Sequence, residues 1–242
     1  MTEEILQEAI KQLRAIAEGV NNPWTVLVSL LGVLVALLLG VIGIFQDRIR
    51  SLFRRPKLDI YIKSEPPDCH KTSFRDSNTG RYICDTYYLR FRVENNGNHY
   101  AEDAEAMVVG VYKRINDNYE EMKDFLPLNV VWSHYRKITM SKIQPKLFKH
   151  LDFGYILKAD FVDLEKFGID RSSNITFQFD VAVIPNTGSH ILLPGDYKIK
   201  VVFAANNLKP IEKTYHLVIK DAWTDDEETM LRDNILIEEI NA

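Results

Sequence analysis

The sequence has few of the residues that define disulfide-rich, fibrous or disordered chains. It holds two cysteines, 11 glycines and 9 prolines in 242 residues. Two cysteines cannot build a disulfide framework, and so little glycine and proline excludes collagen-like and Pro/Gly-rich low-complexity architectures. Hydrophobic residues make up 46% and charged residues 26%, which is typical of a folded chain. The net charge of −4 argues against a dedicated nucleic-acid binder, whose domain is normally basic.

The common catalytic and nucleotide-binding motifs are also missing, including the P-loop, G-x-G-x-x-G, G-x-S-x-G and H-E-x-x-H. Residues 152–154 spell DFG, but the other kinase motifs are absent, so we interpret them as a strand end or turn. Cys69 and Cys84 match no standard zinc spacing and are interpreted as loop and strand residues. His134 is interpreted as an edge histidine beside a core Trp132. We therefore expect no enzyme activity, no cofactor and no metal.

Charge is absent from a 22-residue run between Trp24 and Phe45. As a helix this run is about 33 Å long, which matches the hydrocarbon core of a bilayer, whereas a buried core helix seldom runs so far without a polar face. Asn22 and Pro23 provide an N-cap and a first-turn proline, and Trp24 falls at an interfacial position. A cleavable signal peptide fits less well, because a long acidic segment precedes the run. We predict a transmembrane helix over 23–46.

The charges that flank this helix differ in sign. Residues 1–22 carry a net charge of −2, and the basic juxtamembrane segment 47–57 carries +4. Basic residues stay on the cytoplasmic side, so the C-terminal part is predicted to lie in the cytosol, anchored to the cell membrane by one span. The basic segment either contacts anionic lipid head groups or acts only as a topology signal. Its basic residues are Arg48, Arg50, Arg54, Arg55 and Lys57.

Small residues recur along the predicted span at spacings of three and four, which places them on one helix face. Such a face lets helix backbones approach closely, so it favours a homo-oligomer or packing against another membrane protein. The alternative is that glycine is simply common in membrane helices. The small residues are Ser29, Gly32, Ala36, Gly40 and Gly43.

Residues 1–22 are predicted to form an amphipathic helix with Thr2 as its N-cap. The helix either lies on the membrane surface or packs against neighbouring copies. Packing is favoured, because a helix that lies on a lipid surface is normally rich in lysine and arginine and this one has only two basic residues. Its apolar residues are Ile5, Leu6, Ala9, Ile10, Leu13, Ile16, Ala17 and Val20.

The hydrophobic pattern changes to period two after Pro56, which indicates short strands separated by turns. An antiparallel β-sandwich domain is predicted over 58–222. Residues 64–81 are predicted to be a polar loop, and 146–167 a short helix or an irregular crossover. The predicted strands are 58–63, 87–95, 104–114, 128–134, 175–184, 197–206 and 212–220.

Two segments of this domain resemble immunoglobulin-like sandwiches of bacterial surface and membrane proteins. LRFRVENNGNHYAEDAEAMVVGVY (89–112) is similar to their strand–turn–strand unit, with an Asn-Gly turn between the strands. PGDYKIKVVFAANN (194–207) is similar to a late strand, where Pro-Gly precedes a tyrosine-containing strand. The resemblance implies an immunoglobulin-like fold and no particular activity.

Residues 223–242 are predicted to form an acidic C-terminal helix of about four turns. Thr224 and Glu227 form a capping box before apolar residues at Met230, Leu231, Ile235 and Ile240. The apolar residues are expected to dock the helix, leaving an acidic surface for a partner.

These features predict a single-pass membrane protein whose cytosolic β-sandwich is an interaction or sensory module. The alternative is a ligand-gated oligomeric membrane effector or pore-forming protein, and an enzyme of unrecognised type is a third. The expected partners are membrane lipids, other copies of the chain, and a protein or a small-molecule ligand. Nucleic acid is not expected.

Overall fold

A computed structural model describes residues 7, 8, 10, 11, 14, 15, 18, 23–76 and 78–240, with only the backbone described over 47–53. The chain divides into two compact units, Met1–Arg54 and Arg55–Ala242.

The first unit contains helix α2 (Pro23–Phe53), which begins at the predicted proline and continues past the predicted end at Gln46. Its apolar part, Pro23–Gln46, has a mean hydropathy of 2.9 and is long enough to cross a membrane. None of this apolar part is buried within the described chain. A core helix of a soluble protein would be largely buried, so this helix is not a core helix of the described chain.

Much of the predicted amphipathic helix lies outside the described residues. This applies to the proposed cap Thr2, to the predicted N-cap Asn22, and to all the apolar residues of that helix except Ile10. Ile10 is helical and 43% exposed.

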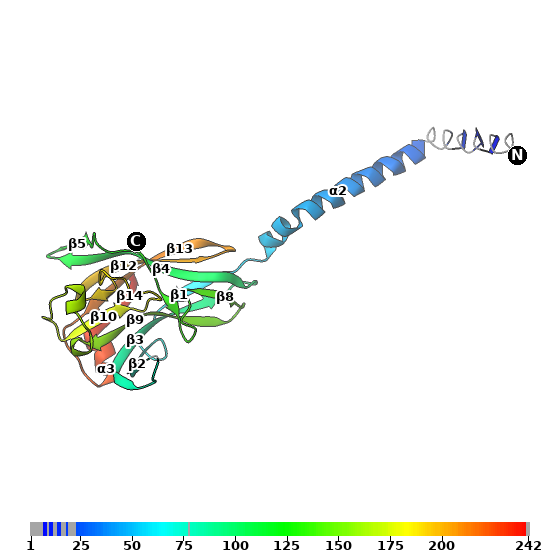
Figure 1. Cartoon of the computed structure of the whole chain (residues 1–242). Helices are drawn as coiled ribbons and strands as arrows, with labels where there is room; N and C mark the ends of the chain where they lie inside the picture. Colours follow the sequence, from blue (N-terminus) through cyan, green and yellow to red (C-terminus); the bar gives the residue numbers. More distant parts are fainter. Residues whose placement is uncertain are drawn as a thin grey trace. The chain divides into compact units, whose positions relative to one another are not determined.

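The second unit is built from two antiparallel sheets (Figure 1). The first sheet has the order β1-β3-β9-β10-β11, with β2 paired to β3 and β7 to β9. Its strands are β1 (Leu58–Tyr61), β2 (Cys69–Arg75), β3 (Tyr82–Asn95), β7 (Val131–Trp132), β9 (Phe148–Lys158), β10 (Ile175–Phe179) and β11 (Ile191–Leu192).

The second sheet has the order β14-β13-β12-β4-β5, with β6 and β8 paired to β4. Its strands are β4 (Ala101–Ile115), β5 (Asn118–Glu121), β6 (Leu128–Asn129), β8 (Thr139–Ile143), β12 (Gly195–Ala205), β13 (Leu208–Ile219) and β14 (Ile235–Ile240). Two short 3₁₀ helices, η1 (Ala159–Phe161) and η2 (Glu165–Phe167), follow β9.

The two sheets share one hydrophobic core. Alternate residues of β3 and β12 are buried, as period-two patterning requires when one face of a strand packs inward. The Phe91 ring in the first sheet lies 5.5 Å from Phe203 and 4.6 Å from Tyr215 of the second sheet, measured between ring centroids. Trp132 Nε1 donates a 3.0 Å hydrogen bond across the core to the carbonyl oxygen of Ala104. The antiparallel sandwich predicted from alternation is therefore present in its coarse form.

Two predictions for segments of this unit are wrong, one in full and one in part. The polar loop predicted over 64–81 contains β2, which pairs along β3 from Cys69 to Arg75. The short helix or irregular crossover predicted over 146–167 is wrong for its first part, which is β9, an 11-residue strand that pairs with both β3 and β10. The second part does hold two short helices, η1 and η2. Polar residues on the outer face of β9 and a register shift near Gly154 interrupt the alternation that would have marked this strand. Residues 152–154 lie inside β9.

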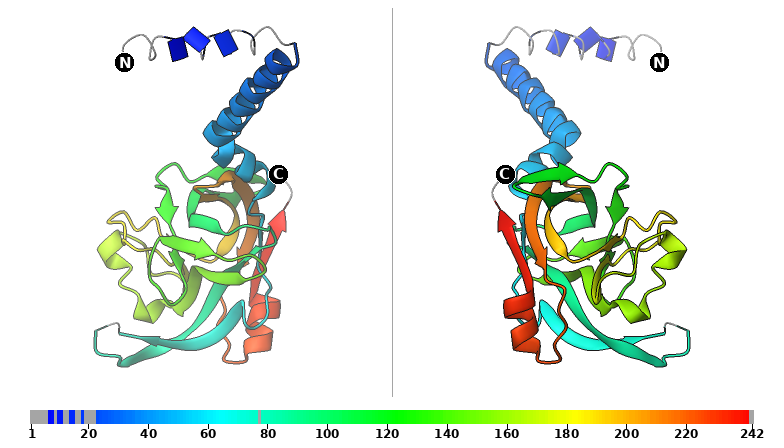
Figure 2. Two further views of the ribbon diagram at one scale, coloured as in Figure 1. Left: turned by 90° about the vertical axis from the view of Figure 1, so that its right-hand side faces the viewer. Right: turned by 90° about the vertical axis from the view of Figure 1, so that its left-hand side faces the viewer.

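The predicted four-turn C-terminal helix is also wrong in length. Helix α3 (Glu227–Thr229) continues as the π-helical η3 (Met230–Asn234), and the chain then enters β14. Asp226, rather than Thr224, caps the helix by accepting a 2.9 Å hydrogen bond from the Thr229 amide. Strand β14 lies along β13, seen in red beside orange in Figure 2, because this pairing buries Ile235 and Ile237 on alternate positions.

The immunoglobulin-like topology stays a prediction. The segment 89–112 that carries the resemblance forms the end of β3, a turn and most of β4, and these two strands belong to different sheets. The segment 194–207 contains β12.

Candidate functional site

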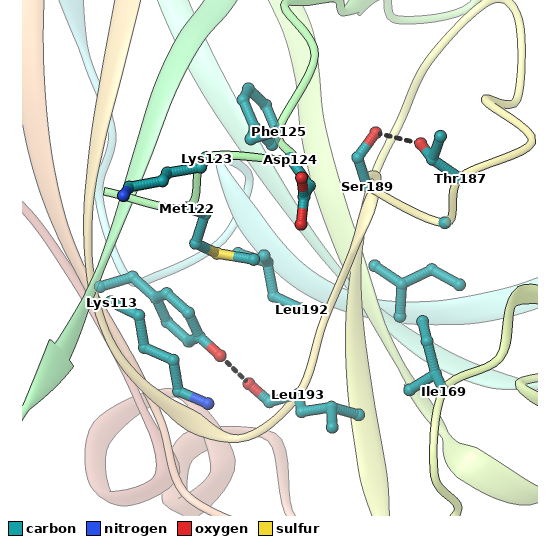
Figure 3. A pocket seen from close by; sticks show the side chains of 13 residues that line it. Lys113, Met122, Lys123, Asp124, Phe125, Ile169, Thr187, Ser189, Leu192 and Leu193 are labelled. Carbon is teal, nitrogen blue, oxygen red and sulfur yellow. Dashed lines mark hydrogen bonds between the residues drawn. The ribbon is translucent and has the colours of Figure 1, made fainter. Parts of the chain in front are cut away.

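A cavity of about 360 Å³ opens where the β4–β5 side of the second sheet faces β11 of the first (Figure 3). This volume is at the lower end of the range of small-molecule sites. The lining residues are Lys113, Met122, Lys123, Asp124, Phe125, Ile169, Thr187, Gly188, Ser189, Ile191, Leu192, Leu193 and Tyr197.

One wall of the cavity is the segment that follows β5. The amide of Met122 donates to the carbonyl of Val111 at 2.9 Å, and the amide of Phe125 donates to Met122 at 2.9 Å, which closes a tight turn. The Phe125 ring packs edge-on against Phe179 at 6.0 Å. The turn is therefore held on both sides, and its apolar side chains line the cavity.

The opposite wall is the loop that leads into β11. The Gly188 backbone has a φ of 72°, and its amide bonds to the Pro185 carbonyl at 3.3 Å. A Cβ at this position would lie 2.8 Å from the Cβ of Phe167. Glycine is required here both by the left-handed backbone and by this close approach. Beside it, the Thr187 hydroxyl donates to Ser189 Oγ at 3.1 Å.

Tyr197 of β12 also lines the cavity. Its ring is buried, and its hydroxyl donates a 2.7 Å hydrogen bond to the carbonyl of Leu193. Burial raises the pKa of Tyr197 to about 12, so the phenol stays protonated and serves as a donor. The ammonium of Lys113 lies 5.9 Å from the centre of the same ring.

The cavity has a largely apolar lining and a few polar groups. Figure 3 shows the Asp124 carboxylate turned toward the middle of the cavity, whereas Lys123 extends away from it. Lys113 supplies a cation near the Leu193 side, and Thr187 and Ser189 supply hydroxyls. An apolar lining with a few convergent polar groups suits a small amphipathic molecule. Within the described part of the chain, no cluster of three His, Cys, Asp or Glu side chains could hold a metal ion.

The residues singled out from the sequence lie elsewhere. The small residues of α2, from Ser29 to Gly43, are exposed, and a Cβ added at Gly32, Gly40 or Gly43 would meet no atom within 4 Å. Ala36 is exposed on the same helix, and Trp24 is 73% exposed.

The basic residues are divided between the helix and the start of the second unit. Arg48 and Arg50 lie in the last part of α2, over which only the backbone is described. Arg54, Arg55 and Lys57 are exposed. The Lys57 amide donates to Asn95 Oδ1 at 3.2 Å, which ties the first residues of this unit to β3.

The two cysteines are buried in the second unit and form no disulfide. Cys69 pairs with Leu89, and Cys84 pairs with Phe74, so they lie far apart along the β2–β3 ladder. Burial raises the pKa of the Cys69 thiol to about 12, which makes it a poor metal ligand and nucleophile. His134 is exposed, and Trp132 is a core residue, as expected.

Sequence reasoning missed the cavity. Two turn signals, Asn186-Thr187-Gly188 and Pro194-Gly195-Asp196, bracket one wall and could have indicated a loop there. No local pattern brings residues 122–125 beside 187–193, because that contact depends on how the two sheets meet. Comparison of the sequence with models of protein families and with curated proteins gave no match, so the site is interpreted from its own geometry.

Proposed function

We propose that this chain is a single-pass membrane protein whose β-rich unit lies in the cytosol and acts as a sensory module for a small molecule. The observation that carries the proposal is the apolar helix Pro23–Gln46, with a mean hydropathy of 2.9 and no part of it buried by the described chain. Exposed apolar surface on this scale is stable in lipid and unstable in water.

The orientation is proposed from flanking charge. The basic segment 47–57 follows the apolar part of α2 directly and leads into the β-rich unit, whereas the segment before the helix is acidic. Retention of arginine and lysine on the cytoplasmic side supports a cytosolic location for residues 55–242.

The sensory role is supported by the cavity. Its lining combines one buried tyrosine, two hydroxyls and opposite charges with an apolar surface, and we infer binding rather than catalysis from this set. In the described chain, the lining holds no histidine or cysteine to act as a base or nucleophile. An immunoglobulin-like sandwich and a protein partner remain part of this proposal.

A second candidate is a ligand-gated oligomeric effector, in which spans from several copies assemble. The observation that favours it is the open face of α2 around Gly32, Gly40 and Gly43. Close helix packing in lipid uses such small residues. A change in membrane conductance on expression would favour this effector over a simple anchor.

Topology is tested with introduced cysteines. Cys69 and Cys84 are buried and cannot report on sidedness, so Lys209→Cys and Gln7→Cys, both at exposed positions, are used as single reporters. An impermeant thiol reagent should label Gln7→Cys in intact cells and reach Lys209→Cys only after lysis. Labelling of Lys209→Cys in intact cells would overturn the orientation, and extraction of the chain by carbonate would overturn the span.

Ligand binding is tested by thermal shift on the full chain in detergent, with a panel of small amphipathic acids, amines and zwitterions. Thr187→Trp should fill the cavity, and Lys209→Trp is a matched surface control. Compounds that use the cavity should raise the Tm of the wild type and of the control, but not that of Thr187→Trp. Equal shifts in all three proteins would exclude the cavity as the binding site.

A further inference from the structure

The outer face of the first sheet carries two aspartates that are almost completely buried. Asp152 of β9 is 7% exposed, and Asp180, directly after β10, is 2% exposed. Asp152 accepts a 2.6 Å hydrogen bond from the Ser133 hydroxyl. Asp180 accepts one from Arg136 through Oδ1, while its buried Oδ2 accepts none from the residues that the structure describes. A buried carboxylate oxygen without a donor is costly, so this site is built for more donors than the described chain supplies.

Aromatic rings lie beside these carboxylates. Tyr88 of β3 and Tyr155 of β9 pack with their ring centroids 5.3 Å apart, and the Tyr155 hydroxyl donates to Gln178 Oε1 at 3.2 Å. Burial raises the pKa of both phenols, the negative charge of Asp180 raises it further, and the positive charge of Arg136 lowers it, so both charges act on the rings. Carboxylates next to tyrosine rings make a favourable environment for a cation.

Arg136 reaches this site from an exposed turn. The turn is closed by hydrogen bonds between Trp132 and Lys137 (2.9 Å) and from the Arg136 amide to the Trp132 carbonyl (3.1 Å). The Arg136 side chain is 61% exposed, whereas that of its partner Asp180 is 3% exposed. The guanidinium gives Asp180 one hydrogen bond, although a guanidinium can give a carboxylate two parallel bonds.

We propose that Asp152, Asp180, Tyr88 and Tyr155 form a binding site for an arginine side chain of a partner protein, and that Arg136 occupies this site in the absence of the partner. A partner guanidinium that approaches in the plane of the Asp180 carboxylate supplies the second donor for Oδ2. Arg136 is then released to solvent, where most of its side chain already lies. The site is separate from the cavity, because none of its four residues lines that cavity.

Chemical rescue tests whether the site accepts a guanidinium. Arg136→Ala is compared with Arg171→Ala, because Arg171 also donates to one aspartate, Asp160, at 2.6 Å, but both of those side chains are exposed. Millimolar ethylguanidinium should raise the Tm of full-length Arg136→Ala in detergent, and ethylammonium should do so less. Neither compound should raise the Tm of the wild type or of Arg171→Ala. Equal responses of the two variants would overturn the site.

Peptide binding tests the partner. The probe is a five-residue acetylated peptide with one central arginine, titrated calorimetrically into the full chain, with a glutamine peptide as the control. Arg136→Ala should bind it about tenfold more tightly than the wild type, since the resident competitor is gone. Asp180→Asn should bind at least about tenfold more weakly, which is the loss expected when a buried charged partner is removed.

The outcomes separate the parts of the proposal. Equal affinity of the wild type and Arg136→Ala would show that Arg136 is not a competitor, and retained binding by Asp180→Asn would overturn the site itself. Equal affinity for the peptide and for acetyl-arginine amide would assign the site to a small guanidinium compound rather than a protein. If Arg136→Ala does not fold, the comparison of the wild type with Asp180→Asn still decides whether the site binds arginine.

Discussion

The hydroxyl of Tyr197 donates a 2.7 Å hydrogen bond to the carbonyl of Leu193, and this bond ties strand β12 to the chain that leaves β11. Tyr215, on the neighbouring strand β13, is equally buried, but its hydroxyl has no hydrogen-bond partner in the described chain. The two tyrosines therefore differ in what their hydroxyls contribute. Tyr197 holds the wall of the cavity, whereas Tyr215 fills the core with its ring.

Removal of the two hydroxyls should have opposite effects. Tyr197→Phe should lower the free energy of unfolding by about 1 kcal/mol, because a satisfied hydrogen bond is lost. Tyr215→Phe should be neutral or stabilising, because it removes a buried polar group that has no partner. Urea unfolding of the full chain in detergent, followed by tryptophan fluorescence, measures both. A larger loss for Tyr215→Phe than for Tyr197→Phe would contradict this assignment.

The cavity wall should depend on Gly188. Gly188→Ala places a Cβ 2.8 Å from Phe167 Cβ at a φ of 72°, whereas Gly168→Ala meets no atom within 4 Å at a φ of 67°. Both variants carry the cost of a left-handed alanine, about 1 kcal/mol, and Gly188→Ala should lose a further 1–3 kcal/mol or so from the steric clash. The difference between their unfolding free energies measures the clash, and equal losses would show that the wall adjusts freely.

Asp180 should make the stability of the protein pH-dependent. Burial raises its pKa to about 6, from an ordinary value of 3.8. The native state binds the carboxyl proton of Asp180 more tightly than the unfolded state does. This tighter binding contributes to the free energy of unfolding in full below pH 3.8, and the contribution is lost as the pH rises through about 6. The difference of about two units between the native and unfolded pKa values corresponds to a change of about 3 kcal/mol in the free energy of unfolding.

The pH dependence is isolated by Asp180→Asn, whose side chain stays neutral. Between pH 4 and 7 the wild type should lose up to about 3 kcal/mol relative to this variant in urea unfolding. Burial lowers the pKa of His70, His150 and His190. These lowered values make the free energy of unfolding rise with pH, but they do so equally in the wild type and in Asp180→Asn. Asp117→Asn, at a side chain that is 98% exposed, serves as the control. Parallel curves for the wild type and Asp180→Asn would show that Asp180 does not titrate in this range.

The small-residue face of α2 should drive self-association. Gly32→Leu with Gly40→Leu should separate helix backbones and weaken the oligomer, while leucine keeps the helix stable in the bilayer. Val41→Leu with Phe45→Leu changes the opposite side of the helix and should leave the oligomer unchanged. Crosslinking and native mass spectrometry in mild detergent compare the three proteins. A monomeric wild type, or the same stoichiometry in all three, would leave the effector proposal without support.

Much of the secondary structure was predictable where one physical requirement dominates. Helix α2 was predicted from the uncharged run, because a bilayer-length apolar helix needs no information from the rest of the chain. Strands β3, β4, β12 and β13 were predicted because one face of each packs on the core, which imposes a period of two on the sequence.

Other elements could not be predicted from local pattern. In β9 the outer-face residue Asp152 is buried and Tyr155 is half-buried, so the contrast between the two faces is weak. At the start of β14 the four-residue spacing of Leu231 and Ile235 also fits a helix, and only pairing with β13 selects the strand. Competing local patterns of this kind are decided by tertiary contacts.

The sequence by itself determined the apolar helix, the antiparallel class and most strand positions, because hydrophobic periodicity is a local property. Only the tertiary structure decided which side chains meet at the cavity and at the buried aspartates. It placed Met122 and Phe125 beside Ser189 and Leu192 around a cavity, and it brought Arg136 onto Asp180 across 44 residues of chain. These groups meet because two sheets close on one core, and contacts between distant segments leave no periodic signal in either segment.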